Sequence, residues 1–139
     1  MTTGPVSDAL ERLQAAHREI AALLARGSAG VPRLAAILAT HAVEEEEVFY
    51  PAVRAASREM RPVLAEAMRQ HRQIDRLLEE VRALPAGGAR RARFAELRKR
   101  IGEHVRQEES VVFPEALRRL GRPERLALGE RMDLASQQR

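Results

Sequence analysis

The segments HAVEEEEVFYP (residues 41–51) and HVRQEESVVFP (residues 104–114) carry the strongest structural signal in the chain. In each segment a histidine is followed by a glutamate four residues later and by a proline ten residues later. Residues i and i+4 lie one turn apart on the same face of an α-helix. Each segment therefore predicts an imidazole and a carboxylate that point together into a protein interior. Because a buried carboxylate is costly unless it is paired or binds a metal, this pattern predicts a metal centre inside a four-helix bundle.

Glycine and proline residues divide the rest of the chain into helices. Ser7-Asp8 is a good N-terminal cap, and Gly27-Ser-Ala-Gly30 ends the helix that follows it. Pro32 suits the first position of a second helix, which Pro51 is expected to kink or terminate. Further helices are predicted over about 57–84, about 90–120 and, as a short tail, about 123–136. No stretch alternates apolar and polar residues for the length of a strand, so the predicted fold class is all-α.

Apolar residues and all four histidines recur at helical spacing. The predicted inward residues are Leu10, Leu13, His17, Ile20 and Leu24; Leu34, Leu38, His41, Glu45 and Val48; Leu64, Met68, His71, Ile74, Leu78 and Val81; and Phe94, Leu97, Ile101, His104, Glu108 and either Val111 or Val112.

The chain contains an internal repeat. HREIAALL (residues 17–24) resembles HRQIDRLL (residues 71–78), just as the two histidine–glutamate segments resemble each other. Two copies of one helical hairpin with short connections predict an up-down-up-down four-helix bundle over about 7–120, within a single domain covering residues 1–139. A residue halfway along each helix then lies at the same height, so all four histidines converge on one layer.

Each of these features has an ordinary explanation when it is taken alone. A histidine on an apolar stripe is usually a core residue bonded to a backbone carbonyl, and the run Glu44–Glu47 is usually a solvated face. Of those four glutamates, Glu45 best shares the face of His41 and Glu44 is next, while the same spacing selects Glu108 rather than Glu109. Together, a core layer of four imidazoles and two carboxylates without metal would leave many polar groups unpaired, at roughly 1–3 kcal/mol each. The combination therefore favours a metal site.

The residue types restrict the metal. The chain has no cysteine, so the ligands are nitrogen and oxygen. Six such ligands exceed what one tetrahedral zinc takes, and four imidazoles are too many for magnesium or calcium. Two carboxylates that can bridge suit two metals roughly 3.5 Å apart, and imidazole with carboxylate favours iron, with manganese as a less favoured substitute. Open positions on such ions predict a small ligand: dioxygen, nitric oxide or peroxide.

The order His, His-xxx-Glu, His, His-xxx-Glu with Phe-Pro following resembles the hemerythrin-like, or HHE cation-binding, domain family. The similarity runs from about Ala9 to the tail helix. It implies a four-helix bundle around an oxo- or hydroxo-bridged non-haem di-iron centre. The resemblance implies that His17 and His41 bind one iron, that His71 and His104 bind the other, and that Glu45 and Glu108 bridge them.

The chain also departs from the oxygen-carrying members of that family. Those proteins have a fifth histidine where this chain has Asp75, and they place the last carboxylate as aspartate at i+5. Asp75 is then either a ligand or an acceptor for an imidazole N–H, and its counterpart in the first helix is Ala21. A more open site favours sensing, peroxide turnover or nitric oxide handling over reversible oxygen carriage. Tyr50, nine residues after His41, is expected to face away and pack at the helix end, the alternative being that a distortion at Pro51 turns it inward. Met68 is expected to fill the core.

Three functions remain open from the sequence. The first is a di-iron module that binds or senses a small ligand, and the second is a di-iron enzyme that decomposes hydrogen peroxide. The third is a metal-free helical interaction module, for which the basic character of the chain suggests nucleic acid as the partner. A pure sensor, by contrast, would need an unidentified protein partner. The net charge of +4 raises the question of nucleic acid, but the basic residues are interleaved with acids, which argues against a phosphate-binding stripe. The absence of a long apolar run and of a signal-like N-terminus predicts a cytoplasmic protein without a membrane segment.

Overall fold

A computed structural model describes residues 7–137 of the chain. The N-terminal stretch before Ser7, on which the expectation about a signal peptide rests in part, lies outside the described residues, as do residues 138 and 139. The long and short α-helices, in order, are α1 (Ala9–Ala25), α2 (Val31–Glu44), α3 (Tyr50–Ala56), α4 (Arg61–Ala83), α5 (Gly88–Gln107), α6 (Phe113–Arg119) and α7 (Arg122–Gln137). The part of the chain described has no strand, which confirms the all-α prediction.

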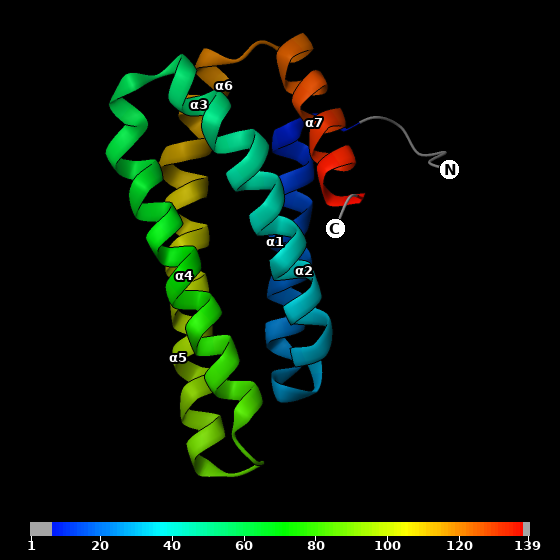
Figure 1. Cartoon of the computed structure of the whole chain (residues 1–139), viewed down its shortest axis with the longest axis vertical. Coiled ribbons are helices and arrows are strands. Elements are labelled where there is room, and N and C mark those ends of the chain that lie inside the picture. The colour runs from blue at the N-terminus through cyan, green and yellow to red at the C-terminus, as the bar shows by residue number, and fades with distance from the viewer. Residues whose placement is uncertain (1–6, 138–139) are drawn as a thin grey trace.

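The helices pack as two pairs (Figure 1). α1 lies along α2, and α4 lies along α5. The short helices α3 and α6 meet at one end of the molecule, and α7 packs against α1 and α2. None of the helices within residues 7–137 combines the length and the apolar character needed to cross a membrane.

α1 begins as predicted at a side-chain cap. The Asp8 carboxylate accepts a hydrogen bond from the backbone N–H of Glu11, and the Glu11 side chain accepts one from the backbone N–H of Asp8. This reciprocal pair satisfies two of the N–H groups that every helix start leaves free. This cap fixes where α1 begins, and so fixes which of its residues, His17 among them, face the core.

Of the two outcomes expected at Pro51, a kink or an end of the second helix, the structure excludes the end. The backbone passes from α2 through a π-helical stretch, Glu45–Phe49, directly into α3, which continues to Ala56. The second proline motif repeats this, with a π-helical stretch at Glu108–Val112 before α6. Proline has no N–H, and its ring clashes with the carbonyl of residue i−4 in a regular α-helix. The wider π turn accommodates each proline, and each helix continues.

The core consists of two apolar clusters with a polar layer between them. One cluster lies at the α3–α6–α7 end and includes Leu13, Val48 and Leu64. The other lies at the opposite end and includes Ile20 and Leu34. Each of the four histidines falls, along its own helix, between residues of the first cluster and residues of the second. The fold therefore encloses the histidine layer in hydrocarbon on both sides.

Candidate metal centre

The structure brings together the six residues that the sequence predicts as ligands. All six are buried, and Glu45 and Glu108 have no exposed surface at all. Their ring-nitrogen and carboxylate-oxygen atoms form two sets, each compact enough to hold a metal ion. The first set is His17, His41, Glu45 and Glu108, and the second is Glu45, His71 and His104.

Glu45 belongs to both sets because its two oxygens face different histidines. Its Oε2 atom lies 3.2 Å from His41 Nε2, on the side of α1 and α2. Its Oε1 atom lies 2.9 Å from His71 Nε2, on the side of α4 and α5. A carboxylate that presents one oxygen to each of two sets of imidazoles has the arrangement that a bridging ligand requires.

Glu108 also reaches both sides. Its Oε1 atom lies 3.0 Å from His17 Nε2 and 3.4 Å from His104 Nε2. Because His17 comes from α1 and His104 from α5, Glu108 connects the two helix pairs, as Glu45 does. In each motif, the i+4 spacing thus selected the glutamate that lies among the histidines.

The outward nitrogens of three imidazoles are bonded to residues that the sequence reasoning did not assign. His17 Nδ1 lies 2.8 Å from Glu109 Oε2, and His71 Nδ1 lies 2.6 Å from Glu46 Oε2. These glutamates directly follow Glu108 and Glu45, so the doubled Glu-Glu in both motifs was a usable signal. His104 Nδ1 lies 2.6 Å from Gln70 Oε1, for which the sequence offered no such pattern.

Glu44, the second choice on the His41 face, lies outside the cluster. It is buried, and its carboxylate accepts two hydrogen bonds from the Arg12 guanidinium, at 2.9 and 2.7 Å. Burial of a carboxylate is tolerated here because Arg12 pairs with it in a fork geometry. Glu44 therefore joins α2 to α1.

Tyr50 was expected to face away from the histidines, and that prediction was wrong. Its ring is fully buried, and its hydroxyl donates to Glu45 Oε1 at 3.1 Å and to Glu108 Oε2 at 2.5 Å. The reason is the π-helical stretch, in which the backbone N–H of Tyr50 bonds to the carbonyl of Glu45 five residues earlier. One extra residue per turn rotates Tyr50 onto the face of Glu45.

Phe113 occupies the position of Tyr50 in the second motif. It stacks on His17, with ring centroids 5.4 Å apart, as Tyr50 stacks on His71 at 5.7 Å. Phenylalanine brings no hydroxyl, so the repeat is symmetric in packing and asymmetric in hydrogen bonding. Of the paired valines, Val112 faces in and Val111 is 43% exposed, while Met68 packs against the core as predicted.

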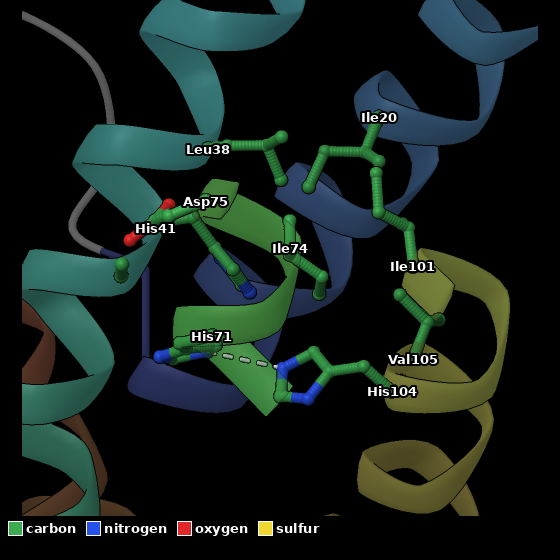
Figure 2. Close-up of a pocket in the computed structure, with 10 residues that line it drawn as sticks. Ile20, Leu38, His41, His71, Ile74, Asp75, Ile101, His104 and Val105 are labelled. Carbon is green, nitrogen blue, oxygen red and sulfur yellow. Dashed lines mark hydrogen bonds between the residues drawn. The ribbon is translucent and has the colours of Figure 1, made fainter. Parts of the chain in front are cut away.

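An apolar cavity adjoins the histidines (Figure 2). Its walls include Ile20, Leu38, Ile74, Ile101 and Val105, and His41, His71 and His104 lie along one side of it. Its volume is about 20 Å³, on a scale where one water molecule needs roughly 10–15 Å³. The space suits a molecule of two heavy atoms.

Asp75 lines this cavity, and within residues 7–137 it is absent from both metal-capable sets. The three imidazole Nδ1 atoms that have partners use Glu46, Gln70 and Glu109, so Asp75 is not their acceptor either. Burial raises the pKa of the Asp75 carboxyl. Asp75 is thus placed as a wall of the cavity.

The charges of the cluster balance one another. Burial alone would lower the pKa of His41, but the Glu45 and Glu108 carboxylates outweigh it and raise that pKa to about 10. The same competition raises the pKa of His71 to about 9, through Glu45 and Glu46. Burial would raise the pKa of Glu45, and the charge of His41 and its other hydrogen bonds hold it well below its usual range. The carboxylates therefore stabilise positive charge in the layer, which suits a cation.

The cluster also passes a test of fit for a metal. Within residues 7–137, three of its buried atoms have no hydrogen-bond partner: His41 Nδ1, His41 Nε2 and Glu45 Oε2. Buried polar atoms without partners are costly and uncommon. A metal ion bound by His41 Nε2 and Glu45 Oε2 would satisfy two of the three. Nitrogen and oxygen donors in this ratio suit iron better than the hard, oxygen-seeking cations.

The family model of the hemerythrin HHE cation-binding domain matches residues 8–116 of the chain. The chain belongs to the hemerythrin HHE cation-binding family. The match spans the whole histidine layer and both His-xxx-Glu motifs, and it ends within α6, so α7 lies beyond it. Comparison with curated proteins gave no match, and neither did comparison with solved structures. Family membership confirms the resemblance stated from the sequence and identifies a cation-binding domain.

Proposed function

We propose that this hemerythrin-family domain is a non-haem di-iron protein that binds or senses a small ligand: dioxygen, nitric oxide or peroxide. His17 and His41 would bind one iron, His71 and His104 the other, and Glu45 and Glu108 would bridge them. The helices that carry these residues would form an up-down-up-down bundle. Manganese is the second choice of metal. A cytoplasmic location remains part of the proposal.

One observation carries this proposal. The two oxygens of Glu45, a fully buried residue, face two different histidines, His41 and His71, that come from separate helix pairs. A single ion beside one of these histidines would leave the oxygen that faces the other histidine without a metal. Two ions that share the carboxylate account for both, and they account for the second carboxylate, Glu108, which also reaches both sides.

The chain's own residues would position the ions, exclude water and select the ligand. Two bound iron ions would supply redox-active centres with coordination positions left for a small molecule. The apolar clusters above and below the layer keep bulk water out, and the small cavity beside His71 and His104 limits the size of what enters. The Tyr50 hydroxyl donates to both bridging carboxylates and holds them in place.

The second candidate function is decomposition of hydrogen peroxide. The size of the cavity agrees with it, because a volume of about 20 Å³ has room for a molecule as small as peroxide. Peroxide disproportionation also needs no separate reductant, since one peroxide oxidises another. The two candidate functions use the same metal centre. They differ in whether the bound molecule is converted to products or released unchanged.

The test begins with the full chain expressed in iron-containing medium. Iron per chain and the absorption spectrum are measured, then measured again after nitric oxide, dioxygen or peroxide is added. We expect about two irons per chain and a spectrum that changes with the ligand. Oxygen evolution from peroxide faster than that of free iron would assign the enzyme, whereas a reversible spectral change without turnover would assign sensing.

Glu45→Gln is the decisive variant, because it removes the charge of a bridging carboxylate while keeping its size. Glu44→Gln is the matched control, since Glu44 is the adjacent buried glutamate and pairs with Arg12 instead. We expect Glu45→Gln to lose at least one iron and Glu44→Gln to keep both. A wild-type chain without bound metal after reconstitution, with an unchanged melting temperature, would contradict the proposal.

A further inference from the structure

The internal repeat allows each histidine to be compared with its counterpart. His17 on α1 corresponds to His71 on α4, and His41 on α2 corresponds to His104 on α5. In each pair the Nε2 atoms lie near the carboxylates, and the Nδ1 atoms of His17, His71 and His104 are bonded to residues outside the six candidate ligands. A metal-bound histidine usually donates its second N–H to an acceptor, which fixes the ring and raises its basicity. The acceptors at the four Nδ1 positions are therefore directly comparable.

Three of the four positions have an acceptor. Glu109 serves His17 and Glu46 serves His71, so the first pair is symmetric. Gln70 serves His104, and the Gln70 amide is held in turn by its hydrogen bond to Gln107 Oε1 at 2.9 Å. Gln70 is thus an oriented group with its oxygen toward the imidazole.

His41 breaks the symmetry. Its Nδ1 atom is buried and has no hydrogen-bond partner within residues 7–137. The reason lies in the chain: Gln70 directly precedes His71, and the residue that directly precedes His17 is Ala16. A methyl group accepts no hydrogen bond. A surface hollow of about 240 Å³, lined in part by Ala16, Thr40, His41 and Glu44, occupies the place of the missing side chain.

We infer that Ala16 makes the His17–His41 position the weaker of the two metal positions, so that ions load stepwise and the His71–His104 position fills first. This inference rests on the proposed di-iron function. Loss of an outer hydrogen-bond partner typically lowers metal affinity about ten- to a hundred-fold. Glu45 belongs to both metal-capable sets, and Glu108, a member of the first set, also has its Oε1 atom 3.4 Å from His104 Nε2. At the imidazoles, the difference between the two positions is the acceptor on Nδ1.

The test restores the missing acceptor. In Ala16→Gln the new amide enters the hollow beside His41, and Glu44 stands where Gln107 stands on the other side. Ala15→Gln is the matched control, because Ala15 is the neighbouring exposed alanine and lines the same hollow. Gln70→Ala makes the reverse change, with Gln73→Ala as its control on the same helix.

The metal-free full chain and these variants are titrated with Co²⁺, whose visible absorption reports coordination, and the loaded proteins are then challenged with a chelator. For the wild type we expect two binding steps at least ten-fold apart and two phases of metal loss. Ala16→Gln should tighten the weaker step about ten- to a hundred-fold and slow the faster loss, while Ala15→Gln should change neither. Gln70→Ala should weaken the tighter step and merge the two.

Wild-type steps of equal affinity would overturn the inference, as would an Ala16→Gln chain that behaves like Ala15→Gln. If circular dichroism shows that Ala16→Gln does not fold, Gln70→Ala decides, and an unchanged first step overturns the inference. In each of these cases two ions still bind, so the proposed function stands. A chain that binds no Co²⁺ at all refutes the proposed function together with the inference.

Discussion

Tyr50 places a phenol hydroxyl between the two carboxylates that have no exposed surface. Hydrogen bonds to charged groups contribute more than neutral ones, about 1.5–3 kcal/mol each. Burial and the charges of Glu45 and Glu108 raise the pKa of the Tyr50 hydroxyl, so it remains a donor at neutral pH. The two halves of the repeat therefore differ at two single residues. Near the carboxylates, Tyr50 carries a hydroxyl and its counterpart Phe113 does not. Near the imidazoles, Ala16 stands where the other half has Gln70.

Tyr50→Phe is predicted to destabilise the metal-free protein by about 1.5–3 kcal/mol, because the ring still fills its space while both carboxylates lose a donor. The measurement is urea denaturation of the metal-free variant against the wild type. Phe49→Leu is a packing control, and it should behave as an ordinary core substitution whose cost does not depend on bound metal. A Tyr50→Phe chain as stable as the wild type would show that the hydroxyl does not support the carboxylates.

At the scale of elements, the two π-helical stretches, Glu45–Phe49 and Glu108–Val112, orient side chains around the candidate metal centre. Each lies between the His-xxx-Glu pair and its proline, and each rotates the following aromatic ring, Tyr50 or Phe113, onto an imidazole of the opposite helix pair. A regular α-helix would have directed those rings elsewhere. The helix type at these positions is therefore part of the site.

The junction of α3 and α6 predicts a dependence of stability on acid. Glu115 accepts hydrogen bonds from Ser57, Arg118 and Arg119, which lower its pKa to about 2 from an ordinary value of 4.5. A carboxyl whose pKa is lowered by folding stabilises the protein above its unfolded pKa, and that contribution disappears as the pH falls from about 4.5 to about 2. Glu115→Gln should therefore reduce stability at neutral pH and flatten its decline over this range.

Denaturation midpoints at a series of pH values check this expectation. Ser57→Ala removes the largest contribution to the lowered pKa and should shift the decline toward higher pH. If Glu115→Gln and the wild type lose stability in parallel over this range, the Ser57–Glu115 contact does not control acid stability.

The contact between α7 and the start of α1 depends on Gly129. A Cβ atom at that position would lie 2.1 Å from the carbonyl oxygen of Ser7, which is backbone and cannot move aside cheaply. Gly129→Ala should therefore cost about 1–3 kcal/mol, as overpacking does, despite the better helix propensity of alanine.

Gly102→Ala is the comparison for this change. Gly102 also lies within a helix, α5, where a Cβ would meet only the end of the flexible Arg106 side chain. It should stabilise the protein by about 0.5–1 kcal/mol. The melting temperatures of both variants are compared with that of the wild type. Equal changes for the two substitutions would mean that α7 does not pack closely on α1.

At the scale of the whole molecule, the proposed metal centre would link the two helix pairs. Glu45 and Glu108 connect them through the histidines, and the apolar clusters at both ends enclose that connection. Metal removal is predicted to lower stability, since a ligand that binds only the folded state at a thousand times its Kd contributes about 4 kcal/mol. That corresponds to roughly 10 °C in melting temperature for a domain of this size.

Calorimetry before and after chelation measures this shift. His104→Ala should show a smaller difference in melting temperature with and without added iron than the wild type, because it removes one imidazole from one of the two metal positions. A wild-type chain with the same melting temperature in both states would show that the two helix pairs hold together without metal.

The fold class and the six candidate ligands could be predicted from the sequence because both depend on local periodicity. A histidine and a glutamate four residues apart share a helix face wherever the helix lies. Four histidines at mid-helix on apolar stripes must then meet if the helices pack side by side. The choice of Glu45 over Glu44, and of Glu108 over Glu109, followed from that spacing alone.

The remaining features depended on tertiary structure, because they involve residues far apart in the chain or a change of helix type. His17 and Glu109 are separated by 92 positions, and His71 and Glu46 by 25, so only packing brings each pair together. The direction of Tyr50 was misjudged because a period of 3.6 residues was assumed through Pro51, where the chain forms a π turn. Local periodicity thus determined which residues enter the layer, and the packing of the helices decided which hydrogen bonds each of them makes there.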